Sequence, residues 1–562
     1  MQLRMPLTTS FEKDAYAYGE RASGETHGVV LTKPHVVDLI LDLARYTADR
    51  PLASLHLLEP SCGTGAFLVP AVTRLLAASR REGVAPKDLL SCISAYDIDE
   101  EHVAATRDVL LQLLRQHDVP ARQAKTLVET WVRQGDFLLS EVEAADVVVG
   151  NPPYIRIEQL SEALLREYRR RFKSLYDRAD LYVAFMEKSL DLLTSKGLLS
   201  FICADRWVLN RYGAPLRQKI SEGFRIQTYI DLHQASPFES EVIAYPSIFA
   251  IGRGKSKNVM VARMKDATPE ECGALADVLL APEKAHSHSL VSIYEKWFQG
   301  DEPWVLSPPG HLETLRALEA RFASIEADGS TKVRIGVATG NDRVFIVPAD
   351  ADVEKDRLVP LVMRADIEQG HIKDTGHYVI NTFDANGKVV DLQKYPRLRA
   401  YFARHEEALR KRHVAQKKET GWFRTIDRVY PELVKKPKLL LPDIAGSNEV
   451  VYDEGRFHPH HNLYFVTSEK WDMEVLGGLL SSKVALFFIW SYAVKMRGGY
   501  LRFQAQYLRR IRLPDPDTIS ARDKAALKKA FQERRFADLD KLAIKVYGLK
   551  ALPEFEFVDT RS

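Results

Sequence analysis

The sequence predicts a doubly wound α/β domain followed by a second domain of the α+β class. Three observations lead to this prediction. The chain has 562 residues, more than one ordinary hydrophobic core accommodates. From about residue 30 to residue 255, short β-type runs alternate with helical stretches, as in a parallel sheet covered by helices on both faces. Beyond about residue 256, irregular strands lie among segments rich in Arg, Lys, His and aromatic residues.

The first domain is expected to contain six strands and four helices, identified by hydrophobic periodicity. The expected strands are Leu55–Leu58, Ser91–Tyr96, Asp146–Val149, Leu198–Ile202, Thr228–Leu232 and Ser247–Ile251. The expected helices are Pro34–Tyr46, Ala66–Arg80, Glu100–Gln116 and Leu181–Leu193. Because helices alternate with strands along the chain, neighbouring strands are expected to run parallel.

The polar stretch Gly252–Lys257, with two glycines, is the expected boundary between the two domains. We therefore expect an N-terminal extension at 1–27, the α/β domain at 28–255 and the α+β domain at 256–562. Candidate strands of the second domain are Arg334–Val337, Val344–Val347, Lys438–Leu441 and Leu463–Val466.

The composition is that of a soluble globular protein with no overall preference for nucleic acid. Lys and Arg total 79 against 76 Asp and Glu, so the net charge is +3 and any basic face must be local. The four cysteines form no CxxC pair, which favours a reducing cytoplasm. Residues 1–19 lack the apolar core of a secretory signal, and the longest apolar run, Val484–Val494, is shorter than the roughly 20 residues that cross a bilayer. We expect a cytoplasmic protein without a membrane span.

A turn containing two glycines follows the first expected strand. In open α/β sheets, ligands bind beyond the carboxyl ends of the strands, so polar residues there are candidate ligand contacts. The turn, Glu59-Pro60-Ser61-Cys62-Gly63-Thr64-Gly65, allows its backbone to approach a ligand closely. Leu68 stands where a dinucleotide fingerprint requires its third glycine. The fingerprint is incomplete, and an ordinary strand-to-helix turn explains the segment about as well.

Two further segments carry polar residues at expected strand ends. Asp97, with Ile98 and Asp99 after it, can accept hydrogen bonds from ribose hydroxyls, although an acid there is also a common helix cap. Asp136 and Phe137 offer a carboxylate for an exocyclic amine and a ring for stacking on a purine, or else form a turn with a core Phe. Together with the glycine turn, these segments favour a nucleoside-bearing cofactor without a pyrophosphate. S-adenosyl-L-methionine fits that description.

The tetrapeptide Asn151-Pro152-Pro153-Tyr154 directly follows a buried apolar run. The lone pair of a planar amino nitrogen is delocalised, so the nitrogen is a poor nucleophile until it becomes pyramidal. The side-chain carbonyl of Asn151 and the backbone carbonyl of Pro152 could accept its hydrogens in that geometry, because the two prolines hold them still. Tyr154 can stack on a base. The tetrapeptide predicts methylation of a planar amine by in-line attack, with no general base required.

In their order along the chain, these motifs resemble those of the gamma-order DNA adenine-N6 methyltransferases. The segment Thr32–Asp38 resembles that family's leading motif, and Phe238 resembles a second aromatic that holds the flipped adenine against Tyr154. The resemblance implies a Rossmann-like methyltransferase domain followed by a target-recognition domain. The implied cofactor-binding residues are Thr32, Glu59, Ser61, Cys62, Gly63, Asp97, Ile98, Asp136 and Phe137, and the implied catalytic residues are Asn151, Pro152, Pro153, Tyr154 and Phe238.

Basic runs interleaved with aromatic residues characterise the second domain. Each run alone is more often a solvated surface, but the combination favours contacts with the phosphates of double-stranded DNA. The basic runs are Arg410–His413, Lys417-Lys418, Lys435–Lys438 and Arg509–Arg512, and the interleaved residues are Trp422, Phe423, Arg424, Tyr430, Tyr500 and Phe503. The segments Gly336–Asp342 and Arg497–Phe503 resemble the specificity domain of TaqI-like type II methylases.

Two motifs of the second domain favour other chemistry. The run His458–His461 suggests a metal, but no Cys, Asp or Glu lies nearby at ligand spacing, so we expect a polar loop and no metal. Asp443 and Glu449 are similar to part of a nuclease core, yet Val450 and Val451 stand where the lysine belongs. We therefore expect no endonuclease in this chain, and a cognate restriction endonuclease would be encoded separately.

Three other functions remain open at this stage. A protein glutamine-N5 methyltransferase uses the same tetrapeptide but is expected to be about half as long, with its substrate domain in front. A cytosine-N4 DNA methyltransferase favours Ser in place of Asn151. A non-catalytic DNA-specificity protein is disfavoured by the intact tetrapeptide. Cytosine-C5 chemistry needs a Pro-Cys pair, which this chain lacks. A monomer and a homodimer both fit the sequence.

Overall fold

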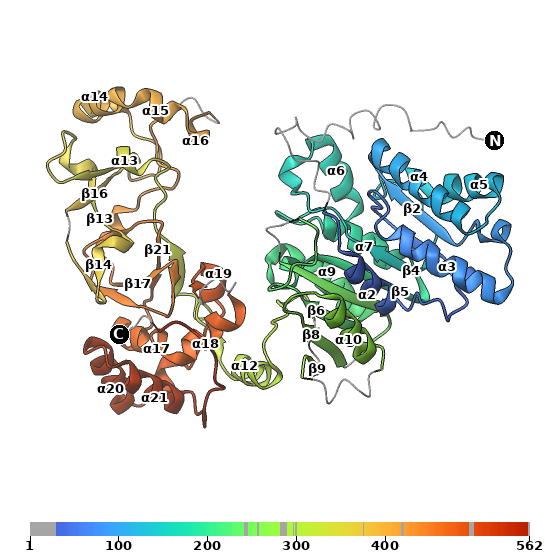
Figure 1. Cartoon of the computed structure of the whole chain (residues 1–562). Coiled ribbons are helices and arrows are strands. Elements are labelled where there is room, and N and C mark those ends of the chain that lie inside the picture. The colour runs from blue at the N-terminus through green and yellow to red at the C-terminus, as the bar shows by residue number, and fades with distance from the viewer. Residues whose placement is uncertain are drawn as a thin grey trace, which may run out of the picture. The chain divides into compact units, whose positions relative to one another are not determined.

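The computed structural model describes residues 30–559, apart from 241–244, 256–257, 282–288, 296, 298–299, 375, 417–420 and 494–499. The chain forms two compact units, Met1–Val305 and Leu306–Ser562 (Figure 1). The extension expected at 1–27, the pair Lys417-Lys418 and residues 497–499 of the segment Arg497–Phe503 lie outside the described residues.

The first unit is built on a mixed sheet whose nine described strands have the order β3-β2-β1-β4-β5-β7-β6-β8-β9. The strands are β1 (Leu57–Glu59), β2 (Ile93–Asp97), β3 (Val132–Gln134), β4 (Ala145–Gly150), β5 (Leu193–Ala204), β6 (Phe224–Asp231), β7 (Pro246–Arg253), β8 (Asn258–Arg263) and β9 (Val291–Glu295). The strands from β3 to β5 are parallel. Their carboxyl ends therefore lie along one edge of the sheet.

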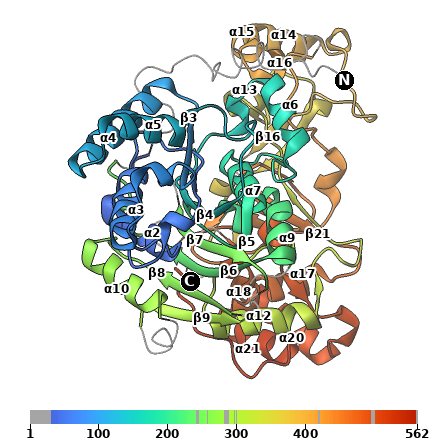
Figure 2. The ribbon, with the colours of Figure 1, turned by 90° about the vertical axis from the view of Figure 1, so that its right-hand side faces the viewer.

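Helices cover both faces of this sheet (Figure 2). They are α2 (Pro34–Leu43), α3 (Leu68–Glu82), α4 (Glu100–Gln116), α5 (Ala121–Trp131), α6 (Glu162–Arg171), α7 (Tyr182–Leu192), α8 (Arg206–Leu209), α9 (Ala214–Gly223) and α10 (Pro269–Leu279). Side chains of α2 to α5 and α10 share one apolar core with Val147 and Val149 of β4. Val148 between them points to the opposite face, where α7 packs on β5. The alternation along β4 thus separates the two helical layers.

The fold class expected for the first domain is confirmed, and each expected strand and helix is present with boundaries shifted by a few residues. The prediction that neighbouring strands run parallel throughout the sheet is wrong, because β7 lies antiparallel between β5 and β6. The connection from β6 to β7 contains no described helix, so the second strand returns beside the first. Strand β3 has only one buried residue, which explains why hydrophobic periodicity misses it.

The first unit also extends beyond the boundary expected after residue 255. Strand β8 pairs in parallel with β6, and β9 pairs antiparallel with β8. These strands bury Val259, Val261 and Tyr294. Since they continue the sheet, the compact unit ends only at Val305.

The second unit contains several small sheets and short helices. Its strands are β10 (Ala323–Ser324), β11 (Lys332–Ile335), β12 (Ile346–Pro348), β13 (Leu358–Val362), β14 (Ile367–Glu368), β15 (His371–Ile372), β16 (His377–Ile380), β17 (Lys438–Pro442), β18 (Ile444–Ala445), β19 (Val451–Asp453), β20 (His458–Pro459), β21 (Leu463–Thr467), β22 (Leu501–Arg502) and β23 (Arg512–Leu513). Its helices are α12 (Pro309–Arg321), α13 (Asp342–Phe345), α14 (Pro396–Arg404), α15 (Glu406–Arg410), α16 (His413–Gln416), α17 (Met473–Leu480), α18 (Lys483–Tyr492), α19 (Ala505–Leu508), α20 (Ala521–Gln532) and α21 (Phe536–Val546).

The α+β class expected for the second domain is confirmed, with one local exception. The sequence predicts a strand at Val344–Val347, but its first two residues close the short helix α13, and only Ile346 and Val347 belong to β12. Val344 and Phe345 are buried in a core cluster, and burial is expected in either conformation, so apolar character does not distinguish helix from strand here.

Among the described residues, no single helix is long and apolar enough to cross a membrane. The bent pair α17 and α18 meets the same test of length and composition only when its two helices are taken together.

Candidate active site

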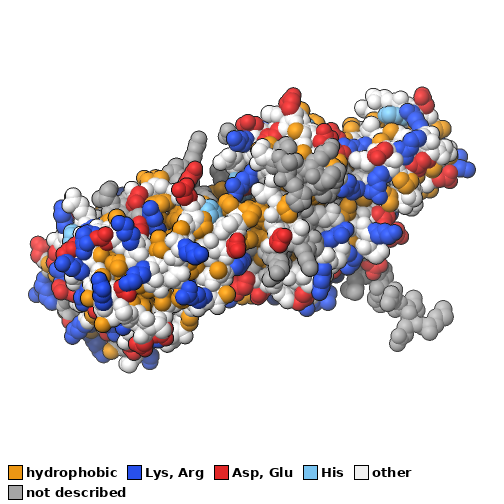
Figure 3. Space-filling view, turned by 90° about the horizontal axis from the view of Figure 1, so that it is seen from below, with side chains coloured by type: hydrophobic (Ala, Val, Ile, Leu, Met, Phe, Trp, Pro, Cys, Tyr) orange, Lys and Arg blue, Asp and Glu red, His pale blue; other side chains and the backbone are white. Residues whose placement is uncertain are grey.

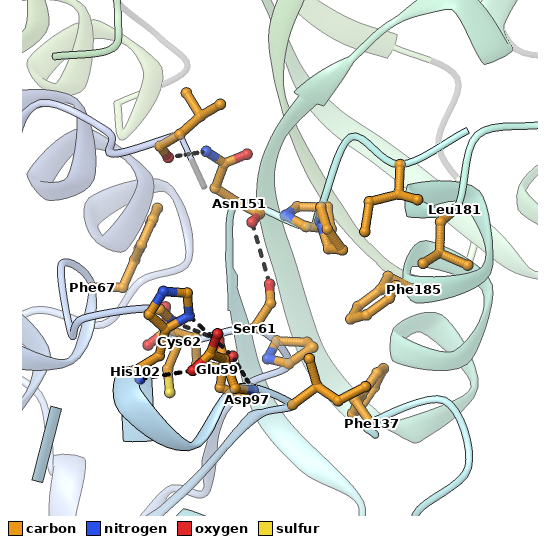
Figure 4. A pocket seen from close by; sticks show the side chains of 18 of the residues that line it. Glu59, Ser61, Cys62, Phe67, Asp97, His102, Phe137, Asn151, Leu181 and Phe185 are labelled. Carbon is orange, nitrogen blue, oxygen red and sulfur yellow. Dashed lines mark hydrogen bonds and ion pairs between the residues drawn. The ribbon is translucent and has the colours of Figure 1, made fainter. Parts of the chain in front are cut away.

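A pocket lies at the carboxyl ends of β1, β2 and β4 (Figure 4). All the residues expected to bind the cofactor line it, together with Asn151, Pro152 and Pro153. Tyr154 and Phe238 are not among the lining residues. The sheet therefore brings together segments that are far apart in the sequence, because parallel strands place the loops after their carboxyl ends at the same edge.

The glycine turn after β1 is held tightly by its neighbours. Gly63 and Gly65 have φ angles of 52° and 93°, a region that favours glycine. The Thr106 hydroxyl on α4 donates a hydrogen bond of 2.7 Å to the Gly63 carbonyl. The backbone of the turn can therefore approach a ligand without a Cβ in the way, and the hydrogen bond from Thr106 holds its shape.

Asp97, the last residue of β2, connects the glycine turn to the start of α4. One carboxylate oxygen accepts the Gly63 amide at 2.8 Å, and the other accepts the Asp99 amide at 3.0 Å. His102 Nδ1 lies 3.3 Å from the second oxygen. Asp99 itself caps α4 by accepting the amides of Glu101 and His102. Asp99 is thus the helix cap of this segment, and Asp97 lines the pocket.

Glu59 at the end of β1 is buried in the pocket wall with only 1% of its surface exposed. Its Oε2 atom has no hydrogen-bond partner among the described residues. Burial, and then the negative charge of Asp97, raise the pKa of the Glu59 carboxyl well above its usual value. An unpaired buried carboxyl group is costly, so this atom fits a site that receives a polar or cationic ligand group.

The side chain of Asn151 is oriented by the segment that precedes α2. Its Nδ2 atom donates to the Val30 carbonyl at 2.9 Å and lies 3.4 Å from the Thr32 hydroxyl. Its Oδ1 atom is buried and has no partner among the described residues. The Ser61 hydroxyl donates to the Asn151 backbone carbonyl at 3.2 Å, which ties the glycine turn to the tetrapeptide (Figure 4). Asn151 therefore offers a fixed, unsatisfied acceptor.

Tyr154 and Phe238 are neighbours, as expected from the sequence. Their ring centroids lie 6.4 Å apart and the rings meet edge to face at 77°. The Tyr154 hydroxyl is buried without a partner among the described residues, and burial raises its pKa well above the usual value. This edge-to-face geometry leaves no parallel slot between the two rings.

The loop that carries Phe238 pairs with the segment that carries Thr32. Thr32 and Phe238 form an antiparallel bridge, in which the Lys33 amide donates to the Pro237 carbonyl and the Glu239 amide to the Leu31 carbonyl, both at 2.9 Å. Because Asn151 also contacts this segment, one short stretch of chain holds both the acceptor and the second aromatic ring.

Three side chains that no sequence motif indicates surround Asp136 and Phe137. The Tyr168 hydroxyl donates to Asp136 at 2.6 Å, and the Phe185 ring stacks on Phe137 with centroids 5.4 Å apart. Lys188 donates to the carbonyls of Phe137 and Ser140, and burial lowers its pKa to about 8. Burial also raises the pKa of Asp136. These residues come from α6 and α7, which lie outside every motif used to predict the site.

The basic runs of the second unit differ widely in exposure. Lys435 and Lys436 are exposed, whereas Lys438 is fully buried and paired with Asp453 at 2.8 Å. Arg412 donates to backbone carbonyls of Thr339, Trp422 and Arg424, so it connects two loops. Lysine and arginine side chains lie scattered among acidic ones on the face in Figure 3. Because Lys438 is buried and paired with Asp453, it cannot contact DNA phosphate, contrary to the prediction from the sequence.

The aromatic residues of the second unit divide in the same way. Tyr430 and Tyr500 are each 42% exposed, and Trp422 is half-buried with Arg410 over its ring at 4.8 Å. Phe423 and Phe503 are core residues with 8% and 1% of their surface exposed. Of these five residues, only Tyr430, Tyr500 and Trp422 can offer a ring face to a nucleic acid. Their exposure follows from tertiary packing, which no sequence pattern encoded.

Two family models match this chain. Residues 91–238 match the Eco57I restriction-modification methylase, and residues 387–513 match the TaqI-like C-terminal specificity domain. The first match spans β2 to Phe238 and so includes Asp97, Asp136 and the tetrapeptide. The second lies within the second unit and begins after its first sheet strands.

Solved structures with a similar fold include the restriction-modification enzyme MmeI, described in complex with DNA. The match covers 92% of this chain and 74% of that one, with a TM-score of 0.60 and 13% identity. The enzyme LlaGI is similar over 90% of this chain and 46% of that one, with a TM-score of 0.52 and 13% identity. At these identities, the similarity shows a common fold.

Similar sequences extend over nearly the whole chain. The type II methyltransferase M.BstVI of Geobacillus stearothermophilus is 44% identical over 93% of this chain and 96% of its own. The type II methyltransferase M.PaeR7I of Pseudomonas aeruginosa is 42% identical over 93% of this chain and 92% of its own. Given these similarities and the two matching family models, this chain belongs to the type II methyltransferases of restriction-modification systems.

Proposed function

We propose that this protein methylates N6 of an adenine that is flipped out of duplex DNA. The observation that carries the proposal is the side chain of Asn151, whose amide nitrogen is held by Val30 while its Oδ1 stays buried and unsatisfied among the described residues. An exocyclic amine supplies the hydrogen that this oxygen lacks. S-adenosyl-L-methionine is the methyl donor, and it supplies an electrophilic methyl group when bound.

The chain's own residues would activate the amine by fixing its geometry. Asn151 Oδ1 accepts one amino hydrogen and the Pro152 carbonyl accepts the other, so the nitrogen becomes pyramidal and its lone pair is free to attack. The Ser61 hydroxyl keeps the Asn151 backbone in place. The methylated amine is cationic and acidic, so it loses its proton to solvent without a dedicated base. Positioning therefore supplies most of the acceleration.

The cofactor would lie across the pocket, and the loop after each strand would contact a different part of it. We assign Asp97 to the ribose hydroxyls, because it lines the pocket and acids at this position accept them in nucleotide-binding sheets. We assign Asp136 and Phe137, which also line the pocket, to the adenine ring of the cofactor, and Ile98 lines the pocket next to Asp97. We assign Thr32 and Glu59 to the methionine end of the cofactor. The unsatisfied Oε2 of Glu59 supports this placement.

Nucleoside analysis of the methylated product tests the proposed base directly. Purified protein is incubated with duplex DNA and labelled S-adenosylmethionine, and the DNA is digested to nucleosides for mass spectrometry. We expect the label in N6-methyladenine. Label in N4-methylcytosine would favour the cytosine-N4 alternative, and label in added protein rather than DNA would favour a glutamine methyltransferase. Absence of transfer to either would favour a non-catalytic protein.

Substitutions of Tyr154 separate the role of its ring from that of its hydroxyl. Tyr154→Phe is expected to keep kcat/KM within a few-fold, because the hydroxyl has no partner among the described residues. Tyr154→Ala is expected to lower kcat/KM by about 10- to 100-fold, since stacking on a base contributes roughly 1–3 kcal/mol. Steady-state rates with duplex DNA measure both. If the Phe variant were as impaired as the Ala variant, base stacking would not be the main role of Tyr154.

The second unit is proposed to bind double-stranded DNA and select the site. The specificity-domain match and the exposed residues Lys435, Lys436, Tyr430 and Tyr500 support this role. A separately encoded cognate restriction endonuclease is the corresponding partner in the cell. The chain's family supports that context, in which methylation protects the host's own sites.

The salt dependence of DNA binding tests the contribution of the exposed lysines. Replacing Lys435 and Lys436 together by Ala is expected to reduce the slope of log K against log salt by about 0.9 for each phosphate that the variant no longer neutralises. The double variant Lys529→Ala with Lys541→Ala, on exposed faces of α20 and α21, serves as the control. Fluorescence anisotropy with a labelled duplex measures the slope. Equal slopes for the wild type and both variants would remove Lys435 and Lys436 from the interface.

A further inference from the structure

Two distant segments of the second unit meet beside β20, and their backbones are locked together. Val337 and His460 form a parallel bridge, with the Val337 amide donating to the Pro459 carbonyl at 2.9 Å and the His461 amide to the Val337 carbonyl at 3.0 Å. A Cβ on Gly336 would lie 2.2 Å from the His460 carbonyl oxygen, so only glycine fits there. The approach of the two segments is therefore fixed by the fold.

This pairing brings Asp342 to the two histidines that end the His458–His461 run. One carboxylate oxygen and one nitrogen from each imidazole all lie within 4.8 Å of one another. His460 Nε2 is 3.2 Å from Asp342 Oδ2. The run has no acid close to it in the sequence at ligand spacing, but the fold supplies one from a segment far upstream. The expectation of a polar loop without a metal therefore needs to be reconsidered.

The side chain of His460 provides a second, independent observation. It is buried with 3% of its surface exposed, and neither ring nitrogen has a hydrogen-bond partner among the described residues. Its Nε2 lies within ion-pair distance of Asp342 Oδ2. The ring is therefore a buried nitrogen ligand that is aimed at the carboxylate.

A bound metal ion is compatible with the distance between these two ligand atoms. Two ligand atoms held tetrahedrally at about 2.0–2.1 Å from a zinc ion lie roughly 3.3 Å apart. The observed 3.2 Å between His460 Nε2 and Asp342 Oδ2 agrees with that separation. Asp342 and His461 are exposed, so their side chains can turn to close the remaining distances.

Hydrogen bonds from the surrounding chain hold Asp342 and the backbone of His460 in place. The hydroxyl of the buried residue Thr339 donates to the other carboxylate oxygen of Asp342. The His460 amide donates to the Val362 carbonyl at 2.9 Å. The hydrogen bond to the carboxylate orients Asp342 as a ligand, and the amide bond fixes the backbone that carries His460. Two imidazoles with one carboxylate suit zinc and similar transition metals rather than magnesium or calcium.

We propose that Asp342, His460 and His461 bind one divalent transition-metal ion of the zinc class. Three protein ligands leave a fourth position on the exposed side, where water binds. The ion would clamp the segment at 336–342 to the loop at 458–462. This site is independent of methyl transfer, so it can be tested whether or not the proposed base is correct.

Zinc binding by the full-length protein tests the site. Protein freed of metal with a chelator is dialysed against micromolar zinc, and bound zinc is measured by atomic emission. We expect one tightly bound zinc per wild-type chain, and a dissociation constant at least about 10-fold higher for Asp342→Ala and for His461→Ala, because each variant removes one ligand. His371→Ala, which removes an exposed histidine on β15, serves as the control and should bind as the wild type does.

Thermal unfolding provides a second readout. Zinc should raise the Tm of the wild type and of His371→Ala, because a ligand of the folded state stabilises it, and should raise it less for the two cluster variants. Circular dichroism without metal checks that every variant folds. The proposal is overturned if the wild type binds no zinc, or if Asp342→Ala and His461→Ala both retain its affinity.

Discussion

Replacing Asn151 by Ala is expected to lower kcat for methyl transfer by about 10²- to 10³-fold, the range found when one preorganised polar group that stabilises a transition state is removed. The reason is that Asn151 Oδ1, buried and without a partner among the described residues, would accept an amino hydrogen most strongly when the nitrogen is pyramidal. An interaction made mainly in the transition state affects kcat rather than ground-state binding. Single-turnover kinetics with saturating DNA and cofactor measure the effect.

The affinities of this variant for S-adenosylmethionine and DNA are expected to stay close to those of the wild type. Asn258→Ala, at the exposed start of strand β8 and outside the pocket, is the matched control and should keep full activity. An Asn151→Ala enzyme with near-normal kcat would contradict the role of the amide. A decrease in cofactor affinity as large as the decrease in rate would instead assign Asn151 to binding.

Asp97→Ala is expected to weaken S-adenosylmethionine binding by about 100-fold or more, since hydrogen bonds to a charged group contribute roughly 1.5–3 kcal/mol each. The substitution removes the proposed acceptor for the ribose. It also releases the amides of Gly63 and Asp99, which the carboxylate holds at 2.8 and 3.0 Å. The glycine turn would then lose its fixed shape. Isothermal titration with the cofactor measures the change.

Asp108→Ala is the matched control for this substitution. Asp108 is an acid on α4 that does not line the pocket, so its removal should leave cofactor affinity unchanged. DNA affinity of Asp97→Ala should stay near that of the wild type, because Asp97 is not among the residues proposed to contact the flipped base or the DNA phosphates. Normal cofactor affinity in Asp97→Ala would show that the ribose binds elsewhere.

The pocket could be predicted from the sequence where a short motif follows a strand. Asp97 and Asn151 each lie at or directly after a predicted strand, and a parallel sheet brings such ends together. Asp136 is identified by its motif, although the short strand β3 before it is not predicted. Tyr168 and Phe185 reach the same pocket from α6 and α7, and Lys188 supports its wall. A side chain that reaches in from a distant helix leaves no local pattern, so these three could be found only in the structure.

The arrangement of the sheet was only partly predictable for a related reason. The β-type runs identify β6 and β7, but not that β7 inserts antiparallel between β5 and β6. Pairing partners are chosen by tertiary packing, not by the hydrophobicity of one strand. The domain boundary was misplaced in the same way, because β8 and β9 look like the irregular strands of the second unit.

Exposure in the second unit depends on the same long-range packing. Lys438 belongs to a basic run but is fully buried against Asp453, which lies on the neighbouring strand β19. Removing either partner would leave an uncompensated buried charge. Conversely, Asp342 and His460 are far apart in the sequence and lie 3.2 Å apart in the fold. Local composition does not reveal that Lys438 is buried. It also does not reveal that the fold brings Asp342 and His460 together as a candidate metal site.

The central claim is that this chain methylates adenine N6 at one DNA sequence through Asn151. Single-molecule sequencing of DNA from cells that express the wild-type chain or Asn151→Ala tests it most directly. We predict N6-methyladenine at nearly every copy of one short motif with the wild type, and none above background with the variant. Methylation of cytosine, no modified motif with the wild type, or equal methylation by Asn151→Ala would contradict the claim.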